Sequence, residues 1–468
     1  NGNGIRDNVE GDQFYDYGFD QWAQYHKRYT NSLTFKGDIT SQITKVHYVK
    51  TGFEFKRFRM KHEEIQYPWY MDESRDPLPP GDWPLRGIFR DYFTRHPASG
   101  AYYIQDKIET KGMIINLGLR LDFTYAGPEV EEVRKEEFSL FGTEIRLSPR
   151  FGISFPISEF DKMYFSYGHF SQVPEFQYFY QDTTQFSSAI RLYGNPNLHS
   201  EETIAYQIGV VHAFGNRAKM EVRGFYKDIR KLIDTESRGY APFTYQIRVN
   251  KDYGSVRGVE LHFDGSPQRF VSLSFDYSLM WAMGKSSSDR QGYDYDYQGI
   301  PLPLREYPLD WDQRHSISTV VDLRSASGEF PVLLGLSFPD KWGINILTQF
   351  ATGFPYTPAE AEEGGRVIPN SARKPNTTST NIKATKWFFL GPLRYEFLVE
   401  IRNVFDRTNI LRVYSETGRP DVSDKANIEY EPDGVTIKAI HPTEYDLNPL
   451  NWQPRRNMFI GFSLGYSF

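Results

Sequence analysis

The last residues of the chain, MFIGFSLGYSF at positions 458–468, alternate between large apolar and small polar side chains. A β-strand places successive side chains on opposite faces, so residues two positions apart share a face. One face then carries Met458, Ile460, Phe462, Leu464, Tyr466 and Phe468. The other carries Phe459 and the small or polar residues Asn457, Gly461, Ser463, Gly465 and Ser467. The pattern predicts a strand with one face against an apolar medium.

The same alternation recurs upstream, for example over residues 113–124, 203–210, 271–279 and 393–402. In each segment an apolar face opposes polar or charged residues, which must face water. About sixteen such segments can be found, most of them near the ~10 residues of a tilted membrane strand. We therefore expect an all-β, antiparallel architecture.

The composition combines many aromatic residues with a polar average. Phe, Tyr and Trp make up 16% of the 468 residues, whereas the hydrophobic fraction is 39% and there is no cysteine. The mean hydropathy is −0.57. A membrane β-barrel has this composition because only one face of each strand is apolar and aromatic residues form girdles at both interfaces.

Two function classes are excluded at this stage. No stretch approaches the ~18 consecutive apolar residues that a transmembrane helix needs, so a helical membrane protein is excluded. The net charge is −6 with acidic and basic residues interspersed, which excludes the basic face of a nucleic-acid-binding protein. A membrane protein of this kind must be a closed barrel, because lipid offers no partner for an unpaired backbone amide.

The expected connections alternate between short and long. Short ones are residues 158–161, 215–217 and 267–269, and long ones are 61–100, 126–146, 172–201 and 284–312. Bacterial barrels have short periplasmic turns and long extracellular loops. The alternative is a soluble propeller or large sandwich, in which the apolar face packs on a second sheet. The number and uniform length of the segments favour an antiparallel transmembrane β-barrel.

The long connections contain two aromatic clusters, which are candidates for ligand contact because loops of this length are commonly functional. The first cluster is Tyr67, Trp69, Tyr70 and Trp83, and the second is Phe176, Tyr178, Phe179 and Tyr180. The alternative is that these rings pack the loops onto one another or onto the barrel rim.

No catalytic or metal-binding pattern stands out. His62-Glu-Glu-Ile-Gln66 lacks the second histidine of a zinc-protease motif, and we interpret it as the start of a polar loop. Asp294-Tyr-Asp-Tyr-Gln-Gly299 approaches a calcium loop but has Arg305 where the bidentate Glu is needed, so a solvated acidic loop is expected. We expect no enzyme activity, no metal and no cofactor.

Five short motifs occur in an order that resembles the barrel of TonB-dependent receptors. They are Ile104-Gln-Asp-Lys107, Ser148-Pro-Arg-Phe-Gly152, Gly194-Asn-Pro-Asn-Leu198 followed by Ser200-Glu-Glu-Thr203, Val256-Arg-Gly-Val-Glu-Leu261 and Asn403-Val-Phe-Asp-Arg-Thr-Asn409. The final aromatic strand, with Leu464, Tyr466 and Phe468, is similar to the signal that outer-membrane proteins present to their assembly machinery. Among such receptors, the chain looks most like the large Bacteroidetes-type group that carries a carboxypeptidase-regulatory-like N-terminal domain.

The resemblance implies a location in the outer membrane of a Gram-negative bacterium. There the receptor would take up a siderophore, cobalamin, glycan or peptide with energy from TonB and its inner-membrane partners. Such barrels have 22 strands around an N-terminal plug, so we expect about sixteen of 22 strands here and the plug outside this chain. We expect residues 1–30 to be irregular and residues 31–468 to form the C-terminal part of the barrel.

The resemblance also suggests a role for charged residues on the lumen side of the strands. These are Arg120, Asp122, Arg394, Glu396, Glu400 and Arg402. They would contact the plug or line the passage, or they would pair with one another and stiffen the wall.

Two rival functions remain open at this point. The first is a passive porin-like channel without a plug. The second is a surface adhesin or assembly barrel whose loops bind another protein. A gene that encodes a plug would exclude the porin, and uptake that depends on TonB would exclude the adhesin.

Overall fold

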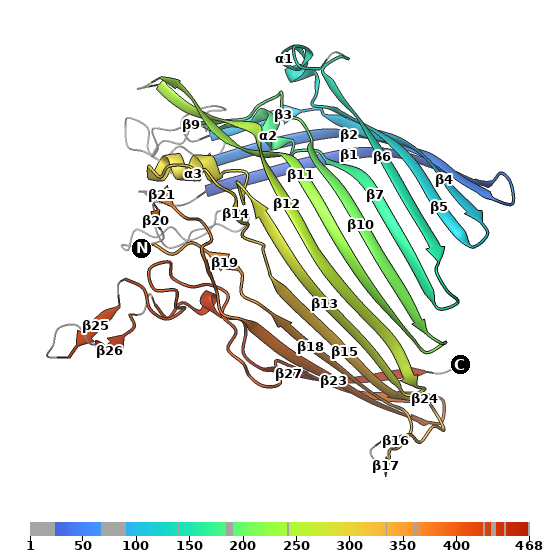
Figure 1. The fold of residues 1–468 in the computed structure, drawn as a ribbon. Coiled ribbons are helices and arrows are strands. Elements are labelled where there is room, and N and C mark those ends of the chain that lie inside the picture. Colours follow the sequence, from blue (N-terminus) through green and yellow to red (C-terminus); the bar gives the residue numbers. More distant parts are fainter. Residues whose placement is uncertain are drawn as a thin grey trace.

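One large sheet forms a curved wall in which long strands follow one another as neighbours in chain order (Figure 1). The computed structural model describes residues 24–466 except 67–89, 139, 184–190, 241–242, 334, 360–361, 364–365, 425, 432–436 and 444–445. In the described part, fifteen strands have ten or more residues. They are β1 (Gln24–Gln42), β2 (His47–Gln66), β4 (Ala98–Thr110), β5 (Met113–Tyr125), β6 (Thr143–Pro156), β7 (Asp161–Gln172), β10 (Glu201–Phe214), β11 (Ala218–Tyr240), β12 (Phe243–Gln268), β13 (Val271–Gly284), β15 (His315–Ser325), β18 (Trp342–Ala351), β23 (Thr377–Leu390), β24 (Leu393–Arg402) and β27 (Asn457–Tyr466).

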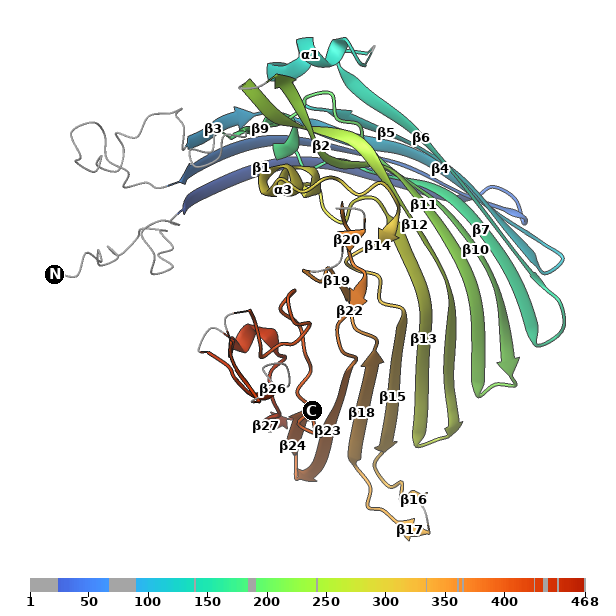
Figure 2. The same cartoon turned by 60° about the vertical axis from the view of Figure 1, so that its left-hand side comes forward.

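The predicted antiparallel order is confirmed, because each of these strands pairs antiparallel with the next one along the chain. The wall curves around a concave face, and β1 and β27 lie at its two ends (Figure 2). Among the described residues, β1 pairs only with β2, and β27 pairs only with β24. The described part of the chain is therefore a barrel wall with two free edges.

The expected boundary at residue 30 needs correction, because β1 already begins at Gln24. Its first residue pairs with Gln66 at the far end of β2. The sequence did not indicate this extension because Lys27 and Asn31 break the apolar alternation there, and the pairing depends on a distant partner strand. Residues 1–23 lie outside the described residues.

The two faces of the wall differ as the alternation predicted. Leu117, Leu119 and Leu121 are 45%, 44% and 40% exposed on the outer face of β5, and Ile460 and Phe462 are 73% and 58% exposed on β27. Large apolar side chains so exposed to solvent are unfavourable in water but belong on the lipid face of a barrel. Leu464 and Tyr466 share this face, and Phe468 lies outside the described residues.

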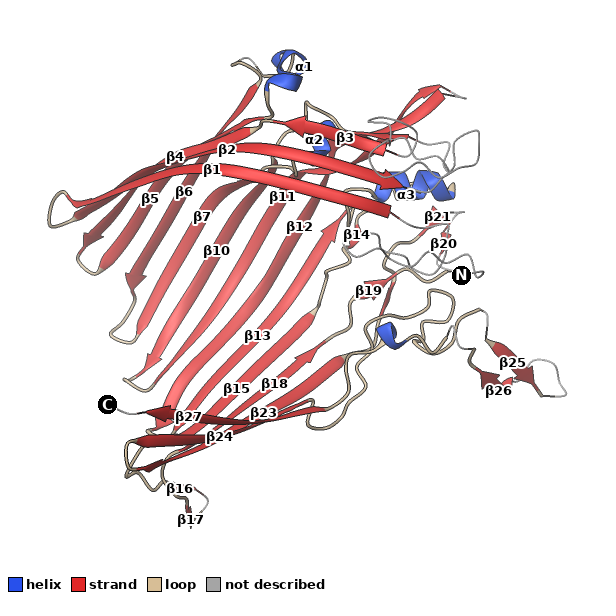
Figure 3. Ribbon diagram, turned by 180° about the vertical axis from the view of Figure 1, so that it is seen from behind, coloured by secondary structure: helices blue, strands red, loops and turns tan. Residues whose placement is uncertain are grey.

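The connections gather by length at opposite ends of the strands (Figure 3). At the short-turn end, Lys111 and Gly112 join β4 to β5 with φ angles of 45° and 80°, the left-handed conformations of a tight hairpin turn. The exception at this end is the longer connection between β15 and β18, which carries the hairpin of β16 (Val332–Leu333) and β17 (Leu336–Ser337). At the long-loop end the exception is the β11–β12 connection, because β11 ends at Tyr240 and β12 begins at Phe243. The other connections follow the predicted division into short turns and long loops.

The remaining short elements lie in the long connections. They are β3 (Arg90–Arg95), η1 (Pro128–Val130), α1 (Glu131–Lys135), α2 (Gln177–Tyr180), β8 (Asp182–Thr183), β9 (Arg191–Tyr193), α3 (Gln291–Gln298), β14 (Tyr307–Pro308), β19 (Pro355–Tyr356), β20 (Glu362–Glu363), β21 (Arg366–Val367), β22 (Ala372–Arg373), β25 (Asn427–Tyr430), β26 (Ile437–His441) and η2 (Pro449–Asn451). None of the helices in the described ranges is long and apolar enough to cross a membrane.

Candidate ligand-binding site

The long connections at one end of the wall and the adjoining ends of β11 and β12 fold together into a loop layer. We define the loop layer as the described residues of 126–142, 173–200, 229–254 and 285–314. Figure 2 shows its helix α3 on the concave side of the wall. The layer contains α2, which carries the second predicted aromatic cluster.

Two of the four predicted aromatic ligands prove to be core residues. Phe179 and Tyr180 are only 2% and 7% exposed. They pack in one apolar cluster with Phe93, Ala126, Leu198 and Ile233. Side chains this deeply buried stabilise the loop layer, so the burial of Phe179 and Tyr180 favours the alternative of loop packing.

The other two aromatic residues are half-buried at the edge of the same cluster. The ring of Phe176 lies 5.4 Å from that of Phe58 on β2. The guanidinium carbon of Arg248 lies 3.9 Å from the ring centroid of Tyr178, a cation–π contact. Phe176 and Tyr178 remain candidates for ligand contact. The first predicted cluster, Tyr67, Trp69, Tyr70 and Trp83, lies outside the described residues.

The Gly194–Leu198 motif holds the loop layer together. The backbone N–H of Asn195 donates to the carbonyl of Tyr178 at 2.8 Å, and its side-chain amide donates to the carbonyl of Arg248 at 2.9 Å. A Cβ on Gly194 would lie 2.6 Å from the backbone nitrogen of Gln181, so no larger residue fits. The motif therefore joins α2 to the hairpin of β11 and β12.

A buried carboxylate ties the same loop to the wall. Glu144 at the start of β6 accepts hydrogen bonds from the Ser200 hydroxyl at 2.7 Å and from the Ser200 backbone N–H at 3.1 Å. Its side chain is 5% exposed and also pairs with Arg146 at 3.0 Å. A buried charge is tolerated only when it is paired and hydrogen-bonded, as this one is.

Helix α3 docks on the β11–β12 hairpin through a buried acidic group. The backbone N–H of Gly292 donates to Asp234 at 2.8 Å, and Lys251 pairs with Asp234 at 3.1 Å. Burial and the neighbouring carboxylate of Asp234 raise the pKa of Asp252 to about 6. The docking of α3 therefore depends on how many charges this group of residues carries.

Two interpretations of polar segments are corrected by the structure. Residues 294–299 form the end of α3, which stops at Gly299 with a left-handed φ of 68°, and are not an acidic loop. His62 lies within β2, is 6% exposed, and stacks on Phe93 with ring centroids 4.9 Å apart. In the ranges that the structure describes, no group of three or more His, Asp or Glu side chains could hold a metal ion.

A cavity of about 240 Å³ lies where the loop layer meets the first strands. Phe176 and Gln177 of the loop and His62 of β2 contribute to its lining. The Arg28 side chain donates to the Gln177 amide oxygen at 2.5 Å across one wall. The cavity offers cationic, amide and aromatic groups together, a combination suited to a polar ligand with aromatic character.

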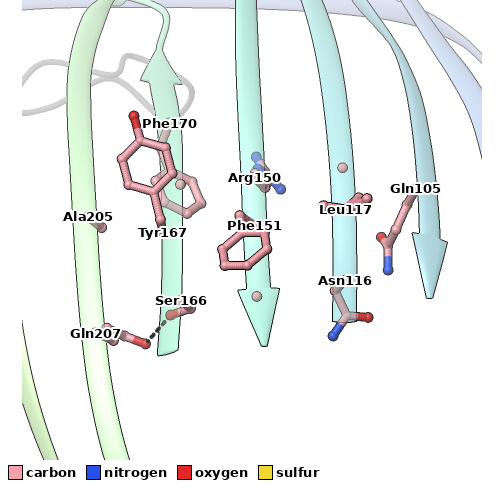
Figure 4. Close-up of a pocket in the computed structure, with 13 residues that line it drawn as sticks. Gln105, Asn116, Leu117, Arg150, Phe151, Ser166, Tyr167, Phe170, Ala205 and Gln207 are labelled. Carbon is pink, nitrogen blue, oxygen red and sulfur yellow. Dashed lines mark hydrogen bonds between the residues drawn. The ribbon is translucent and has the colours of Figure 1, made fainter. Parts of the chain in front are cut away.

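A second and larger hollow, about 370 Å³, lies on the inner face of β4 to β7 and β10 (Figure 4). Gly118, Gly152 and Gly168 leave space there because they have no side chains. The guanidinium carbon of Arg150 lies 4.7 Å from the centroid of the Phe170 ring at its edge. The other lining residues include Gln105, Asn116, Ser166 and Gln207, which are hydrogen-bonding groups. The lining thus combines hydrogen-bonding side chains with aromatic rings.

The predicted lumen charges pair with one another along each strand. Three ion pairs join Arg120 to Asp122 at 2.8 Å, Arg394 to Glu396 at 2.8 Å and Arg402 to Glu400 at 2.6 Å. Each pair is two residues apart and so shares one face of its strand. The alternative of mutual pairing is therefore realised, and contact with a plug stays a prediction.

Sequence reasoning missed several residues that shape the site. Arg248 is 3% exposed and pairs with Asp289 at 2.6 Å, but nothing in its local sequence distinguishes it from a surface arginine. Asn195 could have been found, because it lies within the quoted Gly194–Leu198 motif. Arg28 was missed because it falls in the segment expected to be irregular.

Comparison with known proteins gives one family and several related folds. The family model described as "TonB dependent receptor-like, beta-barrel" matches residues 2–404. A comparison with curated proteins gave no match.

Solved structures resemble the chain at low sequence identity. The siderophore receptor PirA from Acinetobacter baumannii aligns with a TM-score of 0.58 and 14% identity over 96% of this chain and 59% of its own. The outer membrane transporter YddB from Escherichia coli aligns with a TM-score of 0.57 and 12% identity, over 83% of this chain and 52% of its own. A mutant of the ferric enterobactin receptor PfeA from Pseudomonas aeruginosa aligns with a TM-score of 0.56 and 14% identity, over 94% of this chain and 54% of its own. The chain thus shares their fold and spans about half the length of the solved structures that it matches.

Proposed function

Because this chain belongs to the TonB-dependent receptor-like β-barrel family, we propose that it forms the wall of an outer-membrane receptor for TonB-energised uptake. The receptor resides in the outer membrane of a Gram-negative bacterium. TonB and its inner-membrane partners act through a plug domain of the complete protein. The assembly machinery recognises the final strand through Leu464, Tyr466 and Phe468. The protein has no enzyme activity.

The observation that carries this proposal is the asymmetry of the wall. Its outer face exposes apolar side chains, whereas its inner face carries ion pairs and two hollows lined by both polar and aromatic residues. The loop layer lies at one end of the wall, and Phe176 and Tyr178 are half-buried at the edge of its apolar cluster. A substrate that binds at the loop layer and then passes along the inner face needs a wall with its apolar side toward lipid and its polar side toward the lumen.

We propose a ferric siderophore as the first substrate class to test. Two of the related structures are a siderophore receptor and a ferric enterobactin receptor. The cavity beside Phe176, with Arg28 and Gln177 among its lining residues, suits a polar ligand with aromatic rings. Cobalamin, glycans and peptides are the alternative substrate classes.

The test is uptake by cells that express the complete receptor and no other receptor of this family. Radiolabelled ferric enterobactin, cobalamin and a labelled oligosaccharide would be supplied separately to cells with and without TonB. We expect one of these substrates to accumulate only in cells that contain TonB. Equal accumulation without TonB would instead support a porin, and no accumulation of any substrate together with cell adhesion would support an adhesin.

A further inference from the structure

The outer face of β2 changes abruptly from aromatic to cationic along its length. Phe53 and Phe55 are 51% and 36% exposed on this face, and the next residues with the same orientation are Arg57, Arg59 and Lys61. All three cationic side chains are exposed. We call these three residues the basic strip.

The basic strip faces away from the concave side of the wall. The intervening residues face inward, because Phe58 packs on Phe176 of the loop layer and the buried His62 stacks on Phe93. On β1, Leu33 pairs with Arg57 and Phe35 pairs with Phe55. Leu33 and Phe35 are 58% and 55% exposed, so the strip continues directly from the apolar band.

The register places the strip where the wall leaves the membrane. Arg57 is level with Ala98 of β4, which is level with Tyr125 at the end of β5. The Tyr125 hydroxyl already donates to Glu131 of helix α1 at 2.7 Å. One step toward the turns, Phe55 is level with Gly100 and then with Phe123. The boundary between lipid and water therefore lies close to Arg57.

The arginines of the strip differ from the arginines predicted on the lumen side, each of which has an acidic partner. In the part of the chain that the structure describes, neither Arg57 nor Arg59 has a carboxylate within salt-bridge distance, whereas Arg120, Arg394 and Arg402 each have one on the inner face. The Lys61 ammonium lies 5.3 Å from the ring centroid of Tyr92. The strip therefore presents cationic groups, two of them without an acidic partner, toward the lipid headgroups.

We propose that Arg57, Arg59 and Lys61 bind the phosphate groups of an anionic glycolipid in the outer leaflet of the membrane. This inference rests on the proposed outer-membrane location, which puts the loop end of the wall in that phosphorylated leaflet. A guanidinium binds phosphate through two parallel hydrogen bonds, and a basic cluster beside a membrane gains about 1 kcal/mol per residue from anionic headgroups. Residues two apart on a strand are about 7 Å apart, so the strip spans more than one phosphate.

The test is binding of purified diphosphoryl lipid A to the complete receptor in neutral detergent, with native mass spectrometry to measure the bound fraction. The variant Arg57→Gln/Arg59→Gln/Lys61→Gln should bind on the order of 100-fold more weakly, from about 1 kcal/mol for each lost charge. The matched control Lys45→Gln/Lys162→Gln/Arg217→Gln removes the same charge at the short-turn end and should bind like the wild type. Lipid A without its phosphates should bind the wild type as weakly as diphosphoryl lipid A binds the variant.

Two results would overturn the inference: unchanged binding by the variant, or unchanged binding of dephosphorylated lipid A. Folding of each variant is checked by heat-modifiable migration in gels. If the triple variant fails to fold, two double variants replace it. Arg57→Lys/Arg59→Lys keeps the charge and should bind diphosphoryl lipid A within about tenfold of the wild type. Arg57→Gln/Arg59→Gln removes the charge and should bind it more weakly than that. The measurement needs neither TonB nor a transported substrate, so failure of the uptake test would leave its result intact.

Discussion

The wall and the loop layer of this protein place their apolar side chains on opposite sides, the wall toward its outer surface and the loop layer toward its interior. The wall turns Leu119 and Phe462 outward and pairs its charges on the inner face, whereas the loop layer buries Phe179 and the charged Arg248 in its interior. The loop layer is therefore organised like a small water-soluble domain, and the wall like a sheet in lipid. The same truncation should have different consequences in the two regions.

The largest expected effect is in the loop layer. Phe179→Ala removes a buried ring from the cluster of Phe93, Tyr180 and Leu198. Loss of such a ring costs about 3–5 kcal/mol, so the layer should open locally and its amides should exchange with deuterium far faster. The matched change Phe462→Ala on the lipid face should leave loop exchange unchanged. Equal exchange in both variants would contradict the division into two regions.

A charge on the lipid face is expected to have the next largest effect. Leu119 lies in the middle of β5 and is 44% exposed on the outer face. Arginine at the midplane of a bilayer destabilises a barrel by about 2–4 kcal/mol, so Leu119→Arg should lower the free energy of unfolding in liposomes by this amount. Gly118→Ser, next to it on the inner face, serves as the control and should change it much less. A soluble sheet would tolerate Leu119→Arg. If the variant unfolded at the same urea concentration as the wild type, the lipid-facing position of Leu119 would be contradicted.

A pH change should loosen α3 without affecting the wall. The pKa of Asp252 is raised to about 6, above the ordinary value near 3.8, so the folded layer holds a proton that the unfolded chain releases. The stabilising contribution is complete below about pH 4 and is lost as the pH rises through 6, with a limit of about 3 kcal/mol. Exchange in residues 291–298, corrected for its intrinsic pH dependence, should be faster at pH 7.5 than at pH 5. Asp252→Asn should remove this difference, and its persistence would contradict the role of Asp252.

The smallest effect is expected for an ion pair of the inner face. Arg394 and Glu396 are 46% and 32% exposed, and pairs of this kind contribute about 0–1 kcal/mol. Arg394→Gln should therefore lower the free energy of unfolding by less than about 1 kcal/mol, as measured by urea titration in liposomes. A loss as large as that of Leu119→Arg would mean that the inner pairs hold the wall together.

The wall could be predicted from the sequence because its pattern is local. Strand alternation relates residues two apart, so Leu117 to Leu121 and Met458 to Tyr466 revealed their faces directly. Pairing between the lumen charges was one of the two alternatives predicted from the sequence, because residues two apart on a strand share a face. The basic strip could also have been found, since Arg57, Arg59 and Lys61 continue the alternation of Phe53 and Phe55.

The loop layer could not be predicted because its contacts join distant segments. Phe179 is buried by residues as far apart as Phe93 and Ile233, and no local pattern reports such contacts. Glu144 depends on Ser200, and Arg248 depends on Asp289. An aromatic cluster in a long loop therefore indicates a packed loop as readily as a ligand site.

The central claim is that one face of each strand meets lipid, and the strand at residues 457–466 tests it most directly. The chain has no cysteine, so single cysteines can be introduced there one at a time and spin-labelled in liposomes. Labels at 458, 460, 462 and 464 should collide often with oxygen dissolved in the lipid, and labels at 457, 459, 461 and 463 should not. Uniform accessibility to a water-soluble reagent at all eight positions would contradict the membrane wall.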